Sequence, residues 1–341
     1  MGDKTKITMT ELARRANVDV STVSRALNDS PLVKPRTKDL ILKLAAETGY
    51  AINASARNLR RQSSEAIGLV IPLNPDSRQT ISDPFFLEMI GAVSRASSER
   101  GYDLVISIPQ TEEQITEKRL LQTARADGLI IIGQAGRTER LTALGPLADF
   151  VVLWGGWTGQ PNGTLVGSDN VEGGRQAVEH LLNLGRRSIL FLGDTGLPEV
   201  KLRYDGLKMA HAARSHEHAT DLVLPLAFGG AATYDAVCGV IDKGRRFDAI
   251  FAASDVLAMA AIHALQARGL STPQDVAVVG YDNIGQAALM TPALTTIDQN
   301  IQLGGALMVD LLLRKIRGED VQPALTPTNL IVRASCGSRA T

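Results

Sequence analysis

Two patterns of apolar and polar positions follow one another along the chain. Between residues 8 and 48, apolar residues recur every three or four positions, which is the spacing of amphipathic helices. From Ala66 onward, short aliphatic runs alternate with longer segments of helical period. Continuous aliphatic runs are typical of strands in parallel sheets that helices cover on both faces. The pattern therefore predicts a small helical head followed by a larger α/β body.

The head begins with a short amphipathic helix. Thr8 and Glu11 have the spacing of a capping box, so Thr8 is predicted to start this helix. Its inner stripe consists of three residues, Leu12, Ala13 and Ala16. Asn17 and Val18 then form a tight turn that leads into a second helix.

The second helix starts after Asp19, a good N-cap residue. Three of its residues are predicted to pack inward: Val23, Ala26 and Leu27. Four others are left on the outer face: Val20, Ser21, Ser24 and Arg25. Small polar groups near a helix start, with an arginine one turn later, suit insertion into the major groove of DNA.

A third helix is predicted from Pro35 to Thr48, with Pro35 at its first position and Gly49 as its stop. Three of its residues are expected to close the core of the head: Leu40, Leu44 and Ala45. The next segment starts at Asn53, which can cap one or two helical turns, and ends in a polar linker. So short a helix is unstable alone in water, so it is expected to fold only when docked. By composition alone the segment is a linker containing one leucine.

The distribution of charge favours a DNA-binding head over an ordinary helical surface. Residues 1–64 contain 12 Lys and Arg against 6 Asp and Glu, a net charge of +6, and the remainder has 24 against 30. A basic head attracts phosphates, whereas an acidic body resists non-specific adhesion to DNA. Tyr50 is the one aromatic residue of the head, so the head lacks the stacking platform that single strands require.

Composition excludes several other classes of protein. The 341 residues are 44% hydrophobic but only 4% aromatic, which fits a packed α/β protein built from aliphatic side chains. No apolar run approaches the ~20 residues of a membrane span, and no secretion signal is apparent, so a cytoplasmic location is expected. The two cysteines, Cys238 and Cys336, match neither a metal-ligand nor a disulfide pattern. We therefore expect no metal and no cofactor.

The body contains more predicted strands than one compact sheet would hold. They lie at Ile67–Ile71, Leu104–Ile108, Leu129–Ile132, Phe150–Trp154, Ile189–Leu192, Leu222–Leu224, Ala249–Ala252 and Val276–Val279. Two doubly wound lobes are therefore predicted, dividing near Thr164–Ser168. The C-terminal segment Leu330–Cys336 is predicted to form a final strand.

Ligands of such sheets bind beyond the carboxyl ends of the strands, and that rule locates the expected site. Aromatic and charged residues follow the predicted strands in Asp83-Pro84-Phe85-Phe86, Trp154-Gly155-Gly156-Trp157, Gly193-Asp194 with Glu199 and Arg203, Ser254-Asp255, and Gly280-Tyr281-Asp282-Asn283. Aromatic rings stack on the C–H faces of sugars, and planar charged groups bridge paired hydroxyls. A sugar is therefore preferred as ligand, although a purine or nucleoside could use the same groups.

Several motifs resemble those of the lactose-repressor (LacI) family of bacterial transcription regulators. In the head they are Thr22–Asn28, Gly49-Tyr50 and Asn53–Leu59. In the body they are Asp83-Pro84-Phe85-Phe86, Leu202–Gly206, Ala253-Ser254-Asp255, Val279–Asp282 and Leu294–Gln299. The resemblance covers nearly the whole chain. It implies a helix-turn-helix head, a hinge helix and two parallel-sheet lobes that resemble periplasmic sugar-binding proteins.

The resemblance also implies domain boundaries. Residues 1–52 form the DNA-binding head, 53–65 the hinge helix and linker, and 66–341 the core that binds effector and dimerises. Within the core, lobe one is expected to comprise about 66–165 and 294–327, and lobe two about 166–293 and 328–341. The chain is expected to cross between the lobes three times, with the last crossings near Pro292 and Thr328.

In the head, the resemblance implies that base-facing and phosphate-contacting residues come from the helices and the hinge. The implied DNA-binding residues are Thr8, Val20, Ser21, Thr22, Ser24, Arg25, Asn28, Lys38, Asn53, Ala56, Arg57 and Leu59. Leu59 is implied to wedge open a base step in the minor groove, as apolar side chains of architectural DNA-binding proteins do. Ile52 stands where the family usually has proline, and Lys34 cannot cap the third helix as a serine would.

In the body, the resemblance implies an effector site made from both lobes. The implied effector-binding residues are Asp83, Phe85, Phe86, Trp154, Glu199, Arg203, Phe228, Ser254, Asp255, Asp282 and Gln299. Phe85 and Phe86 could instead belong to the core.

The function expected from these features is that of a transcription regulator, and most simply a repressor. A homodimer binds a palindromic DNA operator, and a small-molecule effector between the lobes controls it allosterically. An enzyme is not expected, because the chain has neither a nucleophile elbow nor a nucleotide-binding loop, and the cluster of His211, His216 and His218 lies in a polar segment. A sugar-binding transport module remains an alternative, but it would have no use for a basic head.

Overall fold

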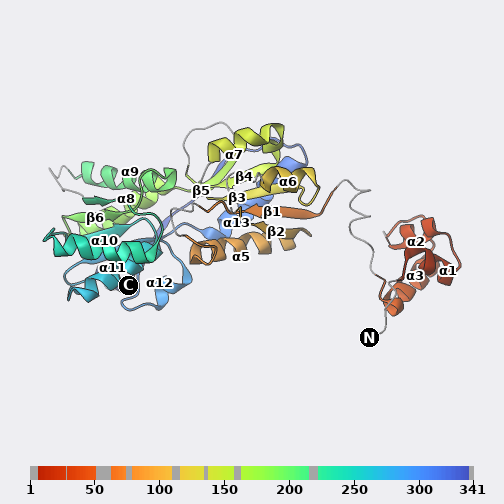
Figure 1. Ribbon diagram of the computed structural model, residues 1–341, viewed down its shortest axis with the longest axis horizontal. Helices are drawn as coiled ribbons and strands as arrows, with labels where there is room; N and C mark the ends of the chain where they lie inside the picture. The colour runs from red at the N-terminus through yellow and green to blue at the C-terminus, as the bar shows by residue number, and fades with distance from the viewer. Residues whose placement is uncertain are drawn as a thin grey trace. The chain divides into compact units, whose positions relative to one another are not determined.

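The computed structural model describes residues 7–27, 29–50, 63–73, 79–109, 116–133, 137–156, 163–214 and 222–337. The chain divides into two compact units, residues 1–64 and 65–341. Figure 1 shows the three helices of the first unit and the two sheets of the second. Among the described residues, none of the helices combines the length and the apolar character that crossing a membrane requires.

The first unit is a bundle of three helices: α1 (Met9–Ala16), α2 (Val20–Leu27) and α3 (Pro35–Thr48). Thr8 caps α1 as predicted, because its Oγ1 accepts a hydrogen bond of 3.2 Å from the amide of Glu11. The Glu11 carboxylate does not complete a capping box in return. It accepts three hydrogen bonds from Arg14 and Arg15, one turn along the helix, and these bonds lower its pKa to about 2.

The core of the first unit differs from the prediction at one position of α3. Leu40, expected in the core, is 47% exposed, whereas Ile41 and Ala45 are buried and Leu44 is half-buried. The inward stripe of α3 therefore follows positions 41, 44 and 45. Leu40 lies about 100° around the helix from that stripe, so it faces outward.

The second unit contains two six-stranded sheets. The order in the first sheet is β11-β5-β4-β3-β1-β2, and all of its strands are parallel. Its strands are β1 (Ala66–Val70), β2 (Asp103–Ser107), β3 (Gly128–Ile132), β4 (Val151–Trp154), β5 (Thr164–Ser168) and β11 (Ala324–Thr326). Two helices cover one face of this sheet, α5 (Pro84–Ser98) and α13 (Ile301–Ile316). The other face is covered by α6 (Thr116–Gln122), α7 (Arg137–Leu144) and the 3₁₀ helix η2 (Gly145–Phe150).

The order in the second sheet is β12-β10-β9-β8-β6-β7, with β12 antiparallel to β10 and the other strands parallel. Its strands are β6 (Ile189–Leu192), β7 (Leu222–Leu224), β8 (Ala249–Ala252), β9 (Ala277–Asp282), β10 (Thr295–Asp298) and β12 (Asn329–Ile331). In Figure 1, helices lie on both sides of this sheet. They are α8 (Asn170–Asn183), α9 (Pro198–Ala212), α10 (Gly230–Asp242), α11 (Asp255–Ala267) and the short α12 (Gly285–Leu289).

Helices α8 and α9 pack at unusually short distance through two glycines. A Cβ atom added to Gly174 would lie 2.1 Å from the carbonyl oxygen of Arg203, and one added to Gly206 would lie 2.1 Å from that of Val171. Neither helix can carry a larger residue at these positions without moving. This contact fixes the helix that carries Arg203.

The two sheets define two lobes, and the chain passes between them three times. The crossings follow β5 (168–170), β10 (298–301) and β11 (326–329). Thr164–Ser168, where the sequence suggested a division, is itself a strand of the first sheet, and the crossing follows it directly. The expected lobe-one segment 294–327 also differs, because β10 belongs to the second sheet and the crossing follows Asp298 instead of Pro292.

The predicted final strand is shorter than expected. It ends at Ile331, and Ala334–Cys336 form the 3₁₀ helix η3. The hydroxyl of Ser335 donates to the carbonyl of Val278 at 2.6 Å and accepts from the amide of Thr295 at 2.8 Å. These bonds turn the chain onto the end of the second sheet. A strand that continued past Ile331 would leave the carbonyl of Val278 and the amide of Thr295 without these partners.

Candidate functional site

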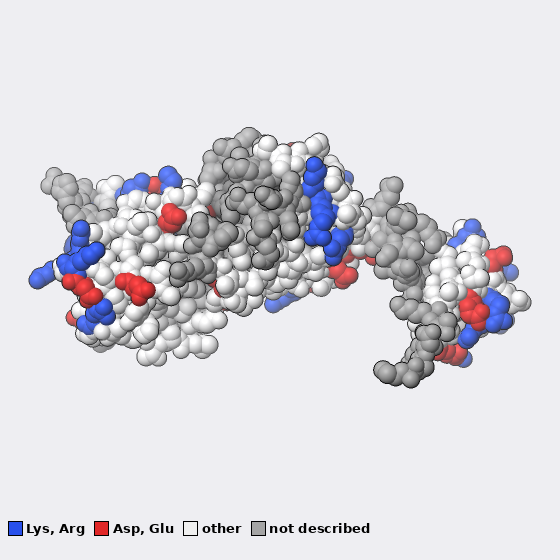
Figure 2. Space-filling model, in the orientation of Figure 1, with Lys and Arg blue, Asp and Glu red and all other residues white. Residues whose placement is uncertain are grey.

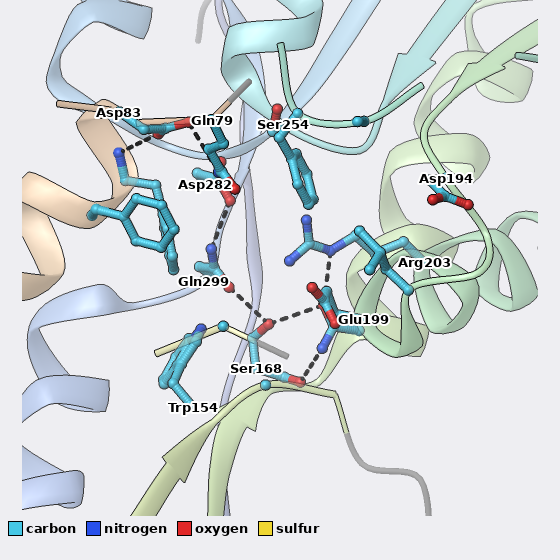
Figure 3. Close-up of a pocket in the computed structure, with 18 of the residues that line it drawn as sticks. Gln79, Asp83, Trp154, Ser168, Asp194, Glu199, Arg203, Ser254, Asp282 and Gln299 are labelled. Atoms are coloured by element: carbon cyan, nitrogen blue, oxygen red, sulfur yellow. Dashed lines mark hydrogen bonds between the residues drawn. The ribbon is translucent and has the colours of Figure 1, made fainter. Parts of the chain in front are cut away.

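A pocket lies between the two lobes, where the carboxyl ends of strands from both sheets meet. Residues that end or follow β4, β5, β6, β8, β9 and β10 all line it, among them Trp154, Ser168, Asp194, Ser254 and Asp282 (Figure 3). The space it encloses, including the part open to solvent, is about 1030 Å³.

The structure brings ten of the eleven predicted effector residues to this pocket. They are Asp83, Phe85, Phe86, Trp154, Glu199, Arg203, Phe228, Ser254, Asp282 and Gln299. These residues come from both lobes, so a ligand here would contact the two sheets at once. Asp255 is the exception.

Arg203 is buried in the wall of the pocket, on α9. Its Nε donates to Asn170 Oδ1 at 2.8 Å, and one terminal nitrogen donates to the carbonyl of Ala253. Its guanidinium carbon lies 3.7 Å from the centre of the Tyr281 ring, in the geometry of a cation–π contact. Two hydrogen bonds and a ring face therefore hold the guanidinium group in one orientation.

A chain of hydrogen bonds links the lobes at the base of the pocket (Figure 3). Ser168 Oγ, at the end of β5, donates to Gln299 Oε1 at 3.1 Å. Gln299 Nε2 in turn donates to Asp282 Oδ1 at 2.6 Å. Because Ser168 belongs to the first sheet and Asp282 to the second, these bonds depend on the arrangement of the lobes.

Asp282 has a strained backbone and a carboxyl group that is hard to ionise. Its φ is +121°, a value that L-residues rarely adopt and that costs on the order of 1–3 kcal/mol. Burial raises the pKa of its carboxyl well above the ordinary value. The nearby Arg203 lowers that pKa in part, whereas the negative charges of Asp255 and Asp83 raise it further.

Asp255 was predicted to bind effector, and the structure corrects this prediction. Its carboxyl is fully buried behind the pocket wall, where it accepts from Thr296 Oγ1 at 2.5 Å and from the amide of Ile284 at 3.0 Å. Burial raises its pKa to about 7. Ser254, one residue earlier, lines the pocket and caps α11 through the amide of Leu257. The rule that ligands bind beyond the carboxyl ends of strands locates this turn. It does not show which of the two adjacent side chains, Ser254 or Asp255, faces the ligand.

Aromatic side chains form the apolar part of the pocket. Phe85 is half-buried and Phe86 buried, with ring centres 5.6 Å apart, so both residues line the pocket and contribute to the core. Trp154 packs against Gly304 of α13, where an added Cβ would lie 2.4 Å from the indole ring. Asp83 caps α5 by accepting from the amide of Phe85 at 3.0 Å. Burial raises the pKa of the Asp83 carboxyl.

Comparison with known proteins places both units of the chain in one family. The model of bacterial regulatory proteins of the lacI family matches residues 8–53, and that of the periplasmic binding protein-like domain matches residues 178–336. The HTH-type transcriptional regulator CelR of Thermobifida fusca is 32% identical over 344 residues, covering 96% of this chain and 98% of that protein. This chain belongs to the lacI family of bacterial regulatory proteins. It is a DNA-binding transcription regulator.

Two further relatives of the same family extend over almost the whole chain. The ribose operon repressor of Halalkalibacterium halodurans is 31% identical over 336 residues, covering 96% of each protein. A solved structure described as a transcriptional regulator CelR–cellobiose complex superposes with a TM-score of 0.71 at 30% identity, covering 96% of this chain and 99% of that one. The relatives are transcription regulators, in agreement with the absence of an enzyme motif from the sequence.

The head of this lacI-family chain presents α2 to solvent as the sequence predicted. Val20, Ser21 and Arg25 are exposed on it, whereas Thr22 and Ser24 are half-buried. Lys38 is paired with the carboxylate of Asp29. Figure 2 shows both Lys or Arg and Asp or Glu side chains on the visible face of the head. Asn28, Asn53, Ala56, Arg57 and Leu59 lie outside the described residues.

Sequence reasoning missed two polar residues of the pocket, Ser168 and Asn170. Ser168 ends β5 and Asn170 follows it, and this segment was interpreted as a boundary between lobes instead of a strand. Treating Thr164–Ser168 as a strand would have pointed to them by the same strand-end rule that located Asp282. Gln79 and Leu197 also line the pocket, and no motif in the sequence marks them.

Proposed function

We propose that this chain is a repressor that binds a palindromic operator as a homodimer and responds to a sugar in the pocket between its lobes. The observation that carries the proposal is the pocket itself, which joins a buried arginine, amide and carboxyl groups, and aromatic rings from both sheets. The protein binds its ligand without chemically transforming it. It acts in the cytoplasm, where the DNA lies.

The lining of the pocket supports a sugar as effector. Arg203, Asn170, Asp282 and Gln299 offer planar polar groups for hydroxyls, and Trp154 offers a flat apolar face. One relative has been solved as a complex with cellobiose, and another is a ribose operon repressor. A nucleoside could use several of the same groups, so it remains the second candidate.

On the DNA side, the proposal assigns base contacts to the exposed face of α2. Arg25 is the residue best suited to pair with guanine O6 and N7, and Ser21 and Val20 lie on the same helix. Contacts with the DNA backbone or with flanking bases are assigned to Thr8, Thr22, Ser24, Asn28 and Lys38. The hinge residues Asn53, Ala56, Arg57 and Leu59 are assigned to the minor groove, with Leu59 as the wedge.

Control by the effector requires that it bind one arrangement of the lobes more tightly than another. Ser168, Gln299 and Asp282 are hydrogen-bonded across the lobes and lie in the pocket wall. A ligand in contact with these groups therefore alters the free energy of one lobe arrangement. We propose that this change reaches the hinge segments through the first lobe.

The proposal is tested by screening the full-length protein for thermal stabilisation with a panel of free sugars and nucleosides. A ligand at about 100 times its dissociation constant adds ~2.7 kcal/mol to stability, which is readily detected. A stabilising sugar is then expected to change the affinity for an operator selected from random DNA. If nucleosides alone stabilise the protein, the proposed effector is a nucleoside instead of a sugar. If no ligand changes operator affinity, the regulatory role of the pocket is disproved.

The DNA contacts are tested separately with Arg25→Ala. This change is expected to weaken operator binding by ~1–3 kcal/mol and to relax base preference at one position in each half-site. Arg36→Ala, which removes an exposed arginine from the start of α3, serves as the matched control. Uniform weakening on all sequences would assign Arg25 to the phosphate backbone instead.

A further inference from the structure

The described lining of the pocket carries four carboxyl groups and a single cationic group. The carboxyl groups belong to Asp83, Asp194, Glu199 and Asp282, and the cation is Arg203; no lysine or histidine is among these described lining residues. The acidic groups come from separate segments of the chain. In Figure 3, Asp83 and Asp282 lie on one side of the pocket, and Asp194 and Glu199 lie on the side of α9. A ligand group therefore meets acidic side chains on either side.

The one cationic side chain of the described lining, Arg203, already interacts with other groups of the protein. Arg203 donates to Asn170 and to the carbonyl of Ala253, and its guanidinium group stacks on the Tyr281 ring. Its positive charge also acts on Asp282, where it partly opposes the effect of burial on that carboxyl. The guanidinium group is therefore held in place by protein groups, and it already interacts with one of the four carboxyl groups.

The N-termini of two helices beside the pocket, α5 and α11, are capped by side chains of the pocket lining. Asp83 accepts from the amide of Phe85 at the start of α5, and Ser254 accepts from the amide of Leu257 at the start of α11. Glu199 lies in the first turn of α9, where a carboxylate interacts favourably with the helix dipole. At α5 and α11, backbone amides that could attract a phosphate thus already have side-chain partners.

The carboxyl groups already oppose each other's ionisation. Burial raises the pKa of Asp83, and the charges of Asp83 and Asp255 add to the effect of burial on the pKa of Asp282. One more negative charge in the pocket would disfavour the ionised form of these carboxyl groups further.

We infer that the effector of this regulator carries no acidic group, so that the pocket accepts a free sugar and rejects its phosphorylated or carboxylated counterpart. This inference rests on the proposed function and narrows its ligand class. It gives the regulator a defined place in metabolism. The protein responds to a sugar before a kinase or phosphotransferase has phosphorylated it, and it does not respond to the sugar phosphate.

The inference is tested with pairs of probes that differ only by a phosphate group: glucose and glucose 6-phosphate, ribose and ribose 5-phosphate, cellobiose and cellobiose 6′-phosphate. Binding to the full-length protein is measured by calorimetry at neutral pH. The neutral member of a pair that binds is expected to bind about tenfold or more tightly than its phosphate, because like charges at close range cost at least that much.

A double variant, Asp194→Asn with Glu199→Gln, shows whether the acidic lining causes the difference. Both changes keep the shape of the side chain and remove its charge. The carbonyl oxygen of the new side-chain amide at position 194 can still accept from the backbone amide of Gly196, as the Asp194 carboxylate does. The ratio of the two affinities is expected to fall about tenfold. Asp235→Asn, which removes an exposed carboxylate from α10, is the matched control and should leave the ratio unchanged.

Two results would overturn the inference. A phosphorylated probe that binds as tightly as its neutral partner disproves it, and leaves the proposed function standing. An unchanged ratio in the double variant disproves the acidic lining as the cause of selectivity. If no member of any pair binds or changes operator affinity, the proposed function fails and the inference fails with it.

Discussion

Asp255 and Asp282 lie close to each other, yet they have different roles. Asp282 faces the pocket, with its backbone held in a strained conformation. Asp255 lies behind it and accepts from the amide of Ile284, while Arg333 donates to the side chain of Asn283 at 2.7 Å. These bonds fix the backbone on the C-terminal side of Asp282. Asp255 thus holds the backbone next to the pocket residue, while its own side chain is not among the described lining residues.

The buried carboxyl of Asp255 makes stability depend on pH. Its pKa is about 7 in the folded protein against 3.8 for the ordinary value, so the folded state holds this proton more strongly than the unfolded state. Stability is therefore expected to fall as the pH rises from about 4 to about 7, by a few kcal/mol at about 1.4 kcal/mol per unit of pKa shift. Urea denaturation of the protein and of Asp255→Asn over this range measures the effect. Parallel pH profiles for the two proteins would contradict it.

Arg203 is the residue on which the effector response is expected to depend most. Arg203→Ala removes the one cation of the described pocket lining and its hydrogen bonds to Asn170 and Ala253. We expect loss of the effector response with operator affinity retained, measured by fluorescence anisotropy with labelled operator. Arg268→Ala, at an exposed arginine paired with Asp242, is the control. An unchanged response would remove Arg203 from the effector site.

At the scale of elements, the sequence located the aliphatic strands and missed the polar ones. β6, β7 and β8 have the predicted bounds, because short aliphatic runs leave a clear signal. β6 and β8 are buried throughout, and the edge strand β7 is half-buried. β10 (Thr295–Asp298) was not predicted, since its threonines are buried through hydrogen bonds from distant residues. Thr296 donates to Asp255, and the amide of Thr295 donates to Ser335. Partners 40 and 41 residues away along the chain cannot be seen in a local pattern.

The glycine contact between α8 and α9 yields a prediction at this scale. Gly206→Ala places a methyl group against the backbone of α8, so the helices must separate. We expect a loss of about 1–3 kcal/mol in the free energy of unfolding, together with weaker effector binding because α9 carries Arg203. Gly239→Ala on α10 is the matched control. Its added Cβ meets nothing within 4 Å, so Gly239→Ala is expected to stabilise slightly. Equal effects of the two changes would show that α8 and α9 can separate freely.

At the scale of the molecule, polar contacts in more than one place join the two lobes. One lies at the edge of the second unit, where Glu88 Oε1 on α5 accepts from the amide of Gly285 on α12 at 2.7 Å. The hydrogen bonds of Ser168 and Gln299 form another set inside the pocket. Because the first contact is outside the pocket, it can be changed without touching the ligand.

Glu88→Ala is expected to shift the balance between lobe arrangements. If effector and operator favour different arrangements, the change must strengthen the binding of one and weaken the binding of the other. Affinities for both ligands, measured on the same protein, are expected to move in opposite directions. Glu99→Ala, at the exposed end of the same helix, is the control. Movement of both affinities in the same direction would show that Glu88 acts on folding instead of on the lobe equilibrium.

The passage of the chain back and forth between the lobes also affects how the protein folds during its synthesis. α13 and β11, residues 301–326, complete the first lobe, yet they follow nearly the whole second lobe in the sequence. Met308, Val309 and Leu312 of α13 belong to the core against β1 and β3. A nascent chain leaving the ribosome therefore holds an unfinished first lobe until residue 326 has been synthesised. Release of the chain before residue 326 yields two incomplete lobes, both exposed to proteases, instead of one finished domain.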